Sequence, residues 1–98
     1  MRYTWQVIKS FRHGGIERFF KTGSKSGIQP VHAGKLSSLL STLDYVKAPE
    51  EMNMPGFGLH RLTGNLQGHW SVKVNANWRV TFTFEGEDAI LVDYLDYH

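Results

Sequence analysis

The sequence contains no cysteine, which excludes disulfide bonds and thiolate metal sites. It also lacks any apolar run near the ~18 residues that a membrane-spanning helix needs. The first ten residues do not contain the long apolar core of a secretory signal. These absences predict a cytoplasmic protein that does not contact a membrane.

The composition is that of a small folded protein. Of the 98 residues, 41% are hydrophobic and 13% are aromatic, which is too much apolar content for a disordered chain. The length predicts a single domain over residues 1–98. Residues 1–6 either extend the first strand or form an N-terminal extension.

Charge is distributed unevenly along the chain. Residues 1–48 carry eight Lys/Arg against two acids, whereas residues 49–98 carry three Lys/Arg against seven acids. A basic first half suits a polyanion or an acidic protein partner. Solvated charges on a helical layer would explain the same imbalance, and Lys21, Lys25 and Lys35 fit either interpretation.

Two helices are predicted in the first half. Ile16, Phe19 and Phe20 have helical spacing, which predicts a helix over Gly15–Thr22 that Gly23 ends. Pro30 can occupy the first turn of a second helix that runs to about Val46. Its apolar stripe consists of Leu36, Leu39, Leu40 and Leu43.

The second half is predicted to be an antiparallel meander, preceded by one helical turn at Pro49–Met52. Its expected strands, separated by Gly- and Asn-rich turns, are Phe57–Leu62, Trp70–Val74, Trp78–Phe84 and Ala89–Tyr97. A further short strand is expected at Val7–Phe11. The predicted fold class is therefore α+β, with two N-terminal helices packed on one face of a twisted antiparallel sheet of four to five strands.

Alternation assigns the two faces of that sheet. Trp70, Val72 and Val74 alternate with polar residues, so one face is apolar and must be covered by the helices. The other face is expected to stay open and to carry Lys73 and Arg79. An arginine there can anchor an anion through its planar fork, although a cross-strand ion pair with Asp93 or Asp96 is the simpler alternative.

The C-terminal half collects groups that suit RNA cleavage without a metal. They are His60, Arg61, Arg79, Asp96, Tyr97 and His98. RNA cleavage needs a base for a 2′-hydroxyl, an acid for the leaving oxygen and a cation on the phosphate. An imidazole, with a pKa of about 6.5 in model peptides, can do either proton transfer near neutrality.

Structural roles compete with each of these assignments. His60 could be a surface residue, His98 could belong to a frayed chain end, and Tyr97 could be a sheet-edge aromatic that fills the core. Trp70 and Trp78 are expected in the core. The five histidines show no paired ligand spacing, so neither a metal nor another cofactor is expected. His13, His32 and His69 are interpreted as surface or loop residues.

Several segments together resemble the HigB toxins, a branch of the RelE/ParE superfamily of bacterial toxin–antitoxin systems. The resemblance covers Val7 to His98 and is carried by Ile8–Phe11, Leu59–Gly64, Gly68–Val72, Asn77–Phe82 and Asp96–His98. It implies a ribosome-dependent mRNA endonuclease whose active residues fall on His60, Arg79, Asp96, Tyr97 and His98. His98 is the favoured general acid, and His60 would be the base or a phosphate ligand.

The resemblance also implies partners and shows departures. The expected partners are the ribosome, mRNA and a HigA-type helix-turn-helix antitoxin, with operator DNA contacted only through that antitoxin. Thr63 occupies the position of a usual family lysine and Arg61 that of a usual proline, so Arg61 or Lys73 could replace the missing cation. Lys21, Lys25 and Lys35 would be the candidates for contacts with ribosomal RNA.

Two other functions fit a chain of this fold. A ParE-like toxin would act on DNA gyrase and would not require His60 or the Asp96–His98 end. A non-catalytic RNA- or protein-binding module would explain Thr63 as part of a decayed site. The histidines and the C-terminal end favour the nuclease over both.

Overall fold

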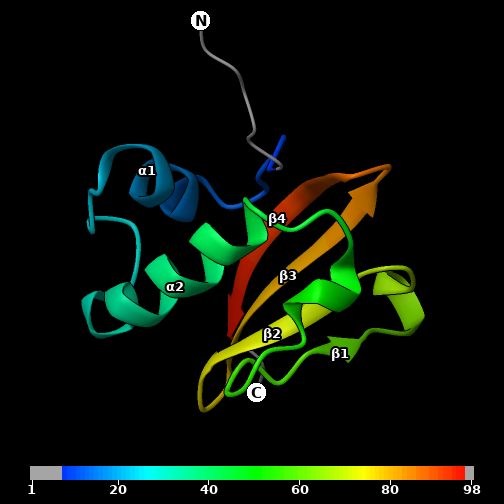
Figure 1. Ribbon diagram of the computed structural model, residues 1–98. Helices are drawn as coiled ribbons and strands as arrows, with labels where there is room; N and C mark the ends of the chain where they lie inside the picture. Colours follow the sequence, from blue (N-terminus) through cyan, green and yellow to red (C-terminus); the bar gives the residue numbers. More distant parts are fainter. Residues whose placement is uncertain (1–7, 97–98) are drawn as a thin grey trace, which may run out of the picture.

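The computed structural model describes residues 8–96 and has two helices in front of a four-stranded antiparallel sheet (Figure 1). The elements are α1 (Gly14–Thr22), η1 (Pro30–His32), α2 (Ala33–Leu43), η2 (Pro49–Met52), β1 (His60–Arg61), η3 (Gly64–Leu66), β2 (Trp70–Asn75), β3 (Trp78–Glu85) and β4 (Asp88–Asp96). The strand order is β1-β2-β3-β4, so the predicted α+β class is confirmed. Over these residues no helix is long and apolar enough to span a bilayer.

Side-chain and backbone caps set both ends of α1. The His13 imidazole Nδ1 accepts a hydrogen bond from the Ile16 amide at 3.1 Å, which satisfies one free N–H of the first turn. Gly23 ends the helix in the left-handed conformation, with φ of 83°, and its N–H reaches the Phe19 carbonyl. The predicted end is confirmed, and the start lies one residue earlier than predicted.

The helix α2 is shorter than predicted. Its leucine stripe, Leu36, Leu39, Leu40 and Leu43, is fully buried as expected. The helix ends at Leu43 instead of near Val46, because the chain turns at Asp44, whose carboxylate accepts from the Ile8 amide at 3.0 Å. Val46 is still buried and remains part of the core.

The three long strands pair antiparallel, with one register shift in each pair, near the β2–β3 turn and between Thr81 and Thr83. Val72, Val80 and Tyr94 stand opposite one another across β2, β3 and β4, and all three side chains are buried. Trp70 and Trp78 lie partly buried against the same core, as predicted. These strands begin and end within about one residue of their predicted bounds, except that the predicted end of β4 at Tyr97 lies outside the described residues.

The predicted strand over Phe57–Leu62 is largely wrong, because ladder pairing is restricted to His60 and Arg61. Before this pair, the Phe57 carbonyl still accepts a hydrogen bond from the Lys73 amide of β2 at 2.7 Å. Gly58, with φ of 59°, interrupts the extended conformation that a longer strand would need. The edge of the sheet next to β2 is therefore formed by a strand of two residues, β1.

The predicted strand over Val7–Phe11 is also replaced by something smaller. Val7 lies outside the described residues, and Ile8 and Phe11 make isolated parallel bridges to Ala89 and Val92 of β4. Between these bridges β4 contains an irregularity at Leu91, whose φ is 56°. The Ser10 hydroxyl accepts from the Leu91 amide at 2.8 Å and so satisfies a donor that the ladder leaves free.

His32 is not the surface residue that the sequence suggests; its side chain is buried. Its Nδ1 lies 2.7 Å from the Tyr94 hydroxyl, which also accepts from the Gln29 amide at 3.2 Å. The Trp78 ring covers the same phenol, with centroids 4.5 Å apart. Burial raises the pKa of Tyr94, and the hydrogen bond from Gln29 partly offsets the increase. This network joins α2 to the sheet.

We expect Tyr94→Phe to lower the free energy of unfolding by about 1–3 kcal/mol, because it leaves the Gln29 amide and the His32 imidazole without their partner in the core. Urea unfolding followed by circular dichroism measures the loss. Tyr45→Phe is the matched control, since Tyr45 is 82% exposed. Equal stability of the two variants would show that the buried hydroxyl of Tyr94 does not contribute to the free energy of unfolding.

Candidate active site

Two rows of side chains cross the sheet face opposite the helices. The register aligns His60, Ser71, Thr81 and Asp93 in one row, and Lys73, Arg79 and Leu95 in the next. This face is less open than predicted, because Ser71 and Thr81 are each only 2% exposed. Their side chains are short and lie between longer neighbours, so they are covered and contribute little to the exposed surface of this face.

Lys73 and Arg79 are directly opposed cations. They are Cα partners in the β2–β3 ladder, with Lys73 exposed and Arg79 half-buried. Like charges placed opposite one another destabilise a sheet. Over residues 8–96 neither of them pairs with a carboxylate, so the ion pair weighed for Arg79 is not formed there. Two cations on one face, without a carboxylate partner in this part of the chain, make an attractive site for an anion.

The Arg79 guanidinium is oriented by the turn that precedes β3. It donates to the carbonyl of Ala76 at 3.2 Å and, less closely, to that of Trp78 at 3.4 Å. A guanidinium has five N–H donors, so these contacts leave others available for a ligand. The turn therefore fixes the direction of the arginine without consuming its capacity.

His60 lies on the same face, one row away from the two cations. Its side chain is exposed, and its Nδ1 is 3.0 Å from the Gly58 carbonyl. A carbonyl oxygen can only accept, so this hydrogen bond places the proton on Nδ1. In the neutral ring Nε2 then carries the lone pair, which is the form that can take a proton from a substrate.

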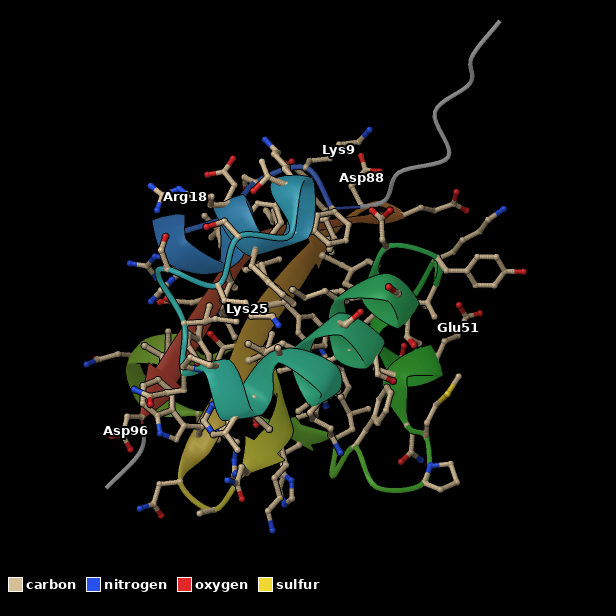
Figure 2. All side chains as sticks on the ribbon, turned by 90° about the vertical axis from the view of Figure 1, so that its left-hand side faces the viewer. Lys9, Arg18, Lys25, Glu51, Asp88 and Asp96 are labelled. Carbon is tan, nitrogen blue, oxygen red and sulfur yellow. The ribbon has the colours of Figure 1, made fainter. Side chains whose placement is uncertain are left out.

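The C-terminal part of the predicted site is described only as far as Asp96. Asp96 is exposed and ends β4 opposite Trp78, so its side chain leaves on the face of Trp78 and not on the face that carries Arg79. Tyr97 and His98, the predicted base-stacking residue and general acid, lie outside the described residues. Figure 2 shows Asp96 at one end of the molecule, with Lys9 and Asp88 at the opposite end.

The structure also separates Arg61 from His60, Lys73 and Arg79. Arg61 follows His60 in a strand, so the two side chains leave on opposite faces. Its guanidinium carbon lies 5.0 Å above the centroid of the Trp70 ring, on the face of the core. Of the two residues considered as replacements for a lysine at position 63, Lys73 is the one that shares a face with Arg79.

The three lysines predicted for ribosome contact have different surroundings. Lys21 pairs with Glu17 at 2.8 Å, and Lys35 donates to the Gly56 carbonyl at 2.8 Å. Lys25 is exposed in the loop between α1 and α2 and lies on the helical side of the molecule (Figure 2). None of the three belongs to the face that carries Arg79.

The opposition of Lys73 and Arg79 is the feature that the sequence reasoning missed. Both residues were placed on one face, but their direct pairing depends on the register of the β2–β3 hairpin. The short turn at Asn75–Asn77 is the signal that could have revealed it, because loop length sets hairpin register.

Comparison with known proteins gives two concordant matches. A family model described as the RelE-like toxin of the type II toxin–antitoxin system HigB matches residues 9–98. The chain is also 38% identical over 92 residues to Endoribonuclease HigB of Proteus vulgaris, an alignment that covers 94% of this chain and all of that protein.

We expect Lys73→Met to raise the free energy of unfolding by a few tenths of a kcal/mol at low salt, because it removes one of two opposed cations. Denaturant unfolding at several salt concentrations measures the gain, which should shrink as salt screens the repulsion. Lys25→Met, in an exposed loop, is the control and should show no such gain. A loss of stability in Lys73→Met at every salt concentration would contradict the repulsion.

Proposed function

Because the chain belongs to the RelE-like HigB toxins of type II toxin–antitoxin systems, we propose that it is an endoribonuclease that cuts messenger RNA in the ribosomal A site. The relative from Proteus vulgaris is named an endoribonuclease, which supports the activity. Dependence on the ribosome rests on the family resemblance.

The observation that carries the proposal is the pair of opposed cations beside an exposed imidazole. Lys73 and Arg79 lack carboxylate partners over residues 8–96, and a phosphodiester supplies the negative charge that this face needs. His60 stands in the adjacent row with a lone pair available on Nε2. Together they provide an anion site and a proton acceptor on one surface.

In the proposed reaction His60 removes the proton of a ribose 2′-hydroxyl, and the 2′-oxygen attacks the adjacent phosphorus. A bond forms between the 2′-oxygen and phosphorus while the bond from phosphorus to the 5′-oxygen breaks. His98 donates a proton to that leaving oxygen, which gives a 2′,3′-cyclic phosphate and a 5′-hydroxyl. Each proton transfer of this type contributes ~10²–10⁴-fold to the rate.

The remaining residues stabilise charge and orient the groups that react. Arg79 is proposed to bind the phosphate oxygens as negative charge develops on them, with Lys73 as a second cation. Asp96 orients its neighbours rather than exchanging a proton. Tyr97 stacks on an unpaired base or orients the phosphate. No metal takes part in this scheme.

A type II toxin has an antitoxin as its partner. We propose that this antitoxin is a HigA-type protein with a helix-turn-helix, and that operator DNA is contacted only through it. The other partners are mRNA and the ribosome, with Lys21, Lys25 and Lys35 contacting ribosomal RNA. Such contacts would weaken as salt rises.

Primer extension on a reporter mRNA in a purified translation system tests the activity. We expect wild-type protein to cut within codons at the A site when ribosomes are present, and His98→Ala to lose these cuts because the leaving oxygen receives no proton. Mixtures without ribosomes are the control. If wild-type protein arrests growth in cells but neither protein cleaves the reporter mRNA, the gyrase-directed or binding-module alternative would be favoured.

Arg79→Lys separates charge from geometry at the phosphate site. We expect it to cleave more slowly than wild type, by about tenfold or more, because an ammonium cannot form the bidentate contacts of a guanidinium. Single-turnover cleavage on programmed ribosomes measures the rate, and Arg18→Lys on α1 is the matched control. Equal cleavage rates for Arg79→Lys and wild type would contradict the proposed bidentate contact of the guanidinium with the phosphate.

A further inference from the structure

A pocket of about 310 Å³ lies at the edge of the sheet, between the end of β1 and the segment that leads from η3 into β2. It is lined by Arg61, Leu62, Thr63, Gln67, Gly68, His69 and Trp70. Ligand pockets in proteins are typically ~300–1,000 Å³, so this one suits a single ring system with its attached sugar. The activity described above makes no use of it.

One wall of the pocket is a planar cation already stacked on an aromatic ring. The Arg61 guanidinium lies over the Trp70 indole, which holds the side chain in place through a cation–π contact. A guanidinium has two faces, and the second remains available for another flat group. Unpaired RNA bases stack on arginine planes in this way.

The other lining side chains offer hydrogen bonds. Thr63 and Gln67 are exposed and carry both donors and acceptors. Both ring nitrogens of His69 are withdrawn from solvent, and among residues 8–96 neither has a hydrogen-bond partner. A buried polar atom without a partner is costly, so turning the imidazole toward a ligand would lose no hydrogen bond and could gain one.

We propose that this pocket binds one unpaired base of the RNA substrate, stacked on Arg61 and read by Gln67 and His69. This inference rests on the proposed ribonuclease function. The positive guanidinium favours a π-electron-rich partner attached to a phosphate backbone, which a nucleotide provides. Purines should bind more strongly than pyrimidines, because their larger ring systems stack more strongly.

The position of the pocket relates the base to the cut. Arg61 and His60 are consecutive residues of a two-residue edge strand, and their side chains leave on opposite faces. A nucleotide bound over Arg61 therefore sits across the sheet edge from the proton acceptor. Such a site selects the base that flanks the cleaved phosphodiester rather than the phosphate itself.

NMR titration of the full-length protein with nucleoside 5′-monophosphates tests the proposal. Adenosine and guanosine monophosphates should shift the Trp70 indole and His69 ring signals, and ribose 5-phosphate should not, because it has no base. Arg61→Lys retains the charge but loses the plane, so its affinity should fall by roughly fivefold or more. Arg18→Lys, in α1, is the matched control and should bind as wild type does.

Three outcomes would overturn the proposal. Equal shifts with ribose 5-phosphate would show that the pocket binds only phosphate. An unchanged nucleotide affinity of Arg61→Lys would show that the base does not stack on the guanidinium. The absence of any shift at Trp70 or His69 would leave no base site at all. His60→Ala keeps this test independent of catalysis, since it should lose cleavage and still bind the nucleotides.

Discussion

The register of β2, β3 and β4 is the constraint on which the rest of the molecule depends. It places Val72, Val80 and Tyr94 in one buried row under the helices, and Lys73 and Arg79 opposite each other on the far side. A shift of one residue between strands would exchange the two faces. The hydrophobic core thus fixes the geometry of the candidate active site, because burying one row determines which residues the other face presents.

Periodicity was sufficient to predict the parts of the fold whose contacts repeat along the chain. The leucine stripe of α2 and the alternation in β2 and β3 each identify an element and its buried face. What periodicity could not supply is pairing between distant segments. The burial of His32 depends on Tyr94, 62 residues later, and the ends of β1 depend on the conformation of Gly58.

The candidate site was predictable in its residue types and less so in its arrangement. His60 and Arg79 could be selected because an imidazole and a guanidinium supply the proton transfer and the cation that RNA cleavage requires. The separation of Arg61 from His60 follows from strand geometry once β1 is known to include both residues. Residue identity suggests the chemistry, whereas the backbone decides which groups can act on the same atom.

The segment of residues 8–12 has a consequence for how the chain behaves outside a complex. Its bridges at Ile8 and Phe11, with the irregularity at Leu91, occupy and distort the outer edge of β4. The opposite edge offers just the two residues of β1 over the described part of the chain. Long unpaired strand edges are what allow copies of a β protein to add to one another. A newly made molecule of this fold therefore offers little exposed strand edge for edge-to-edge aggregation.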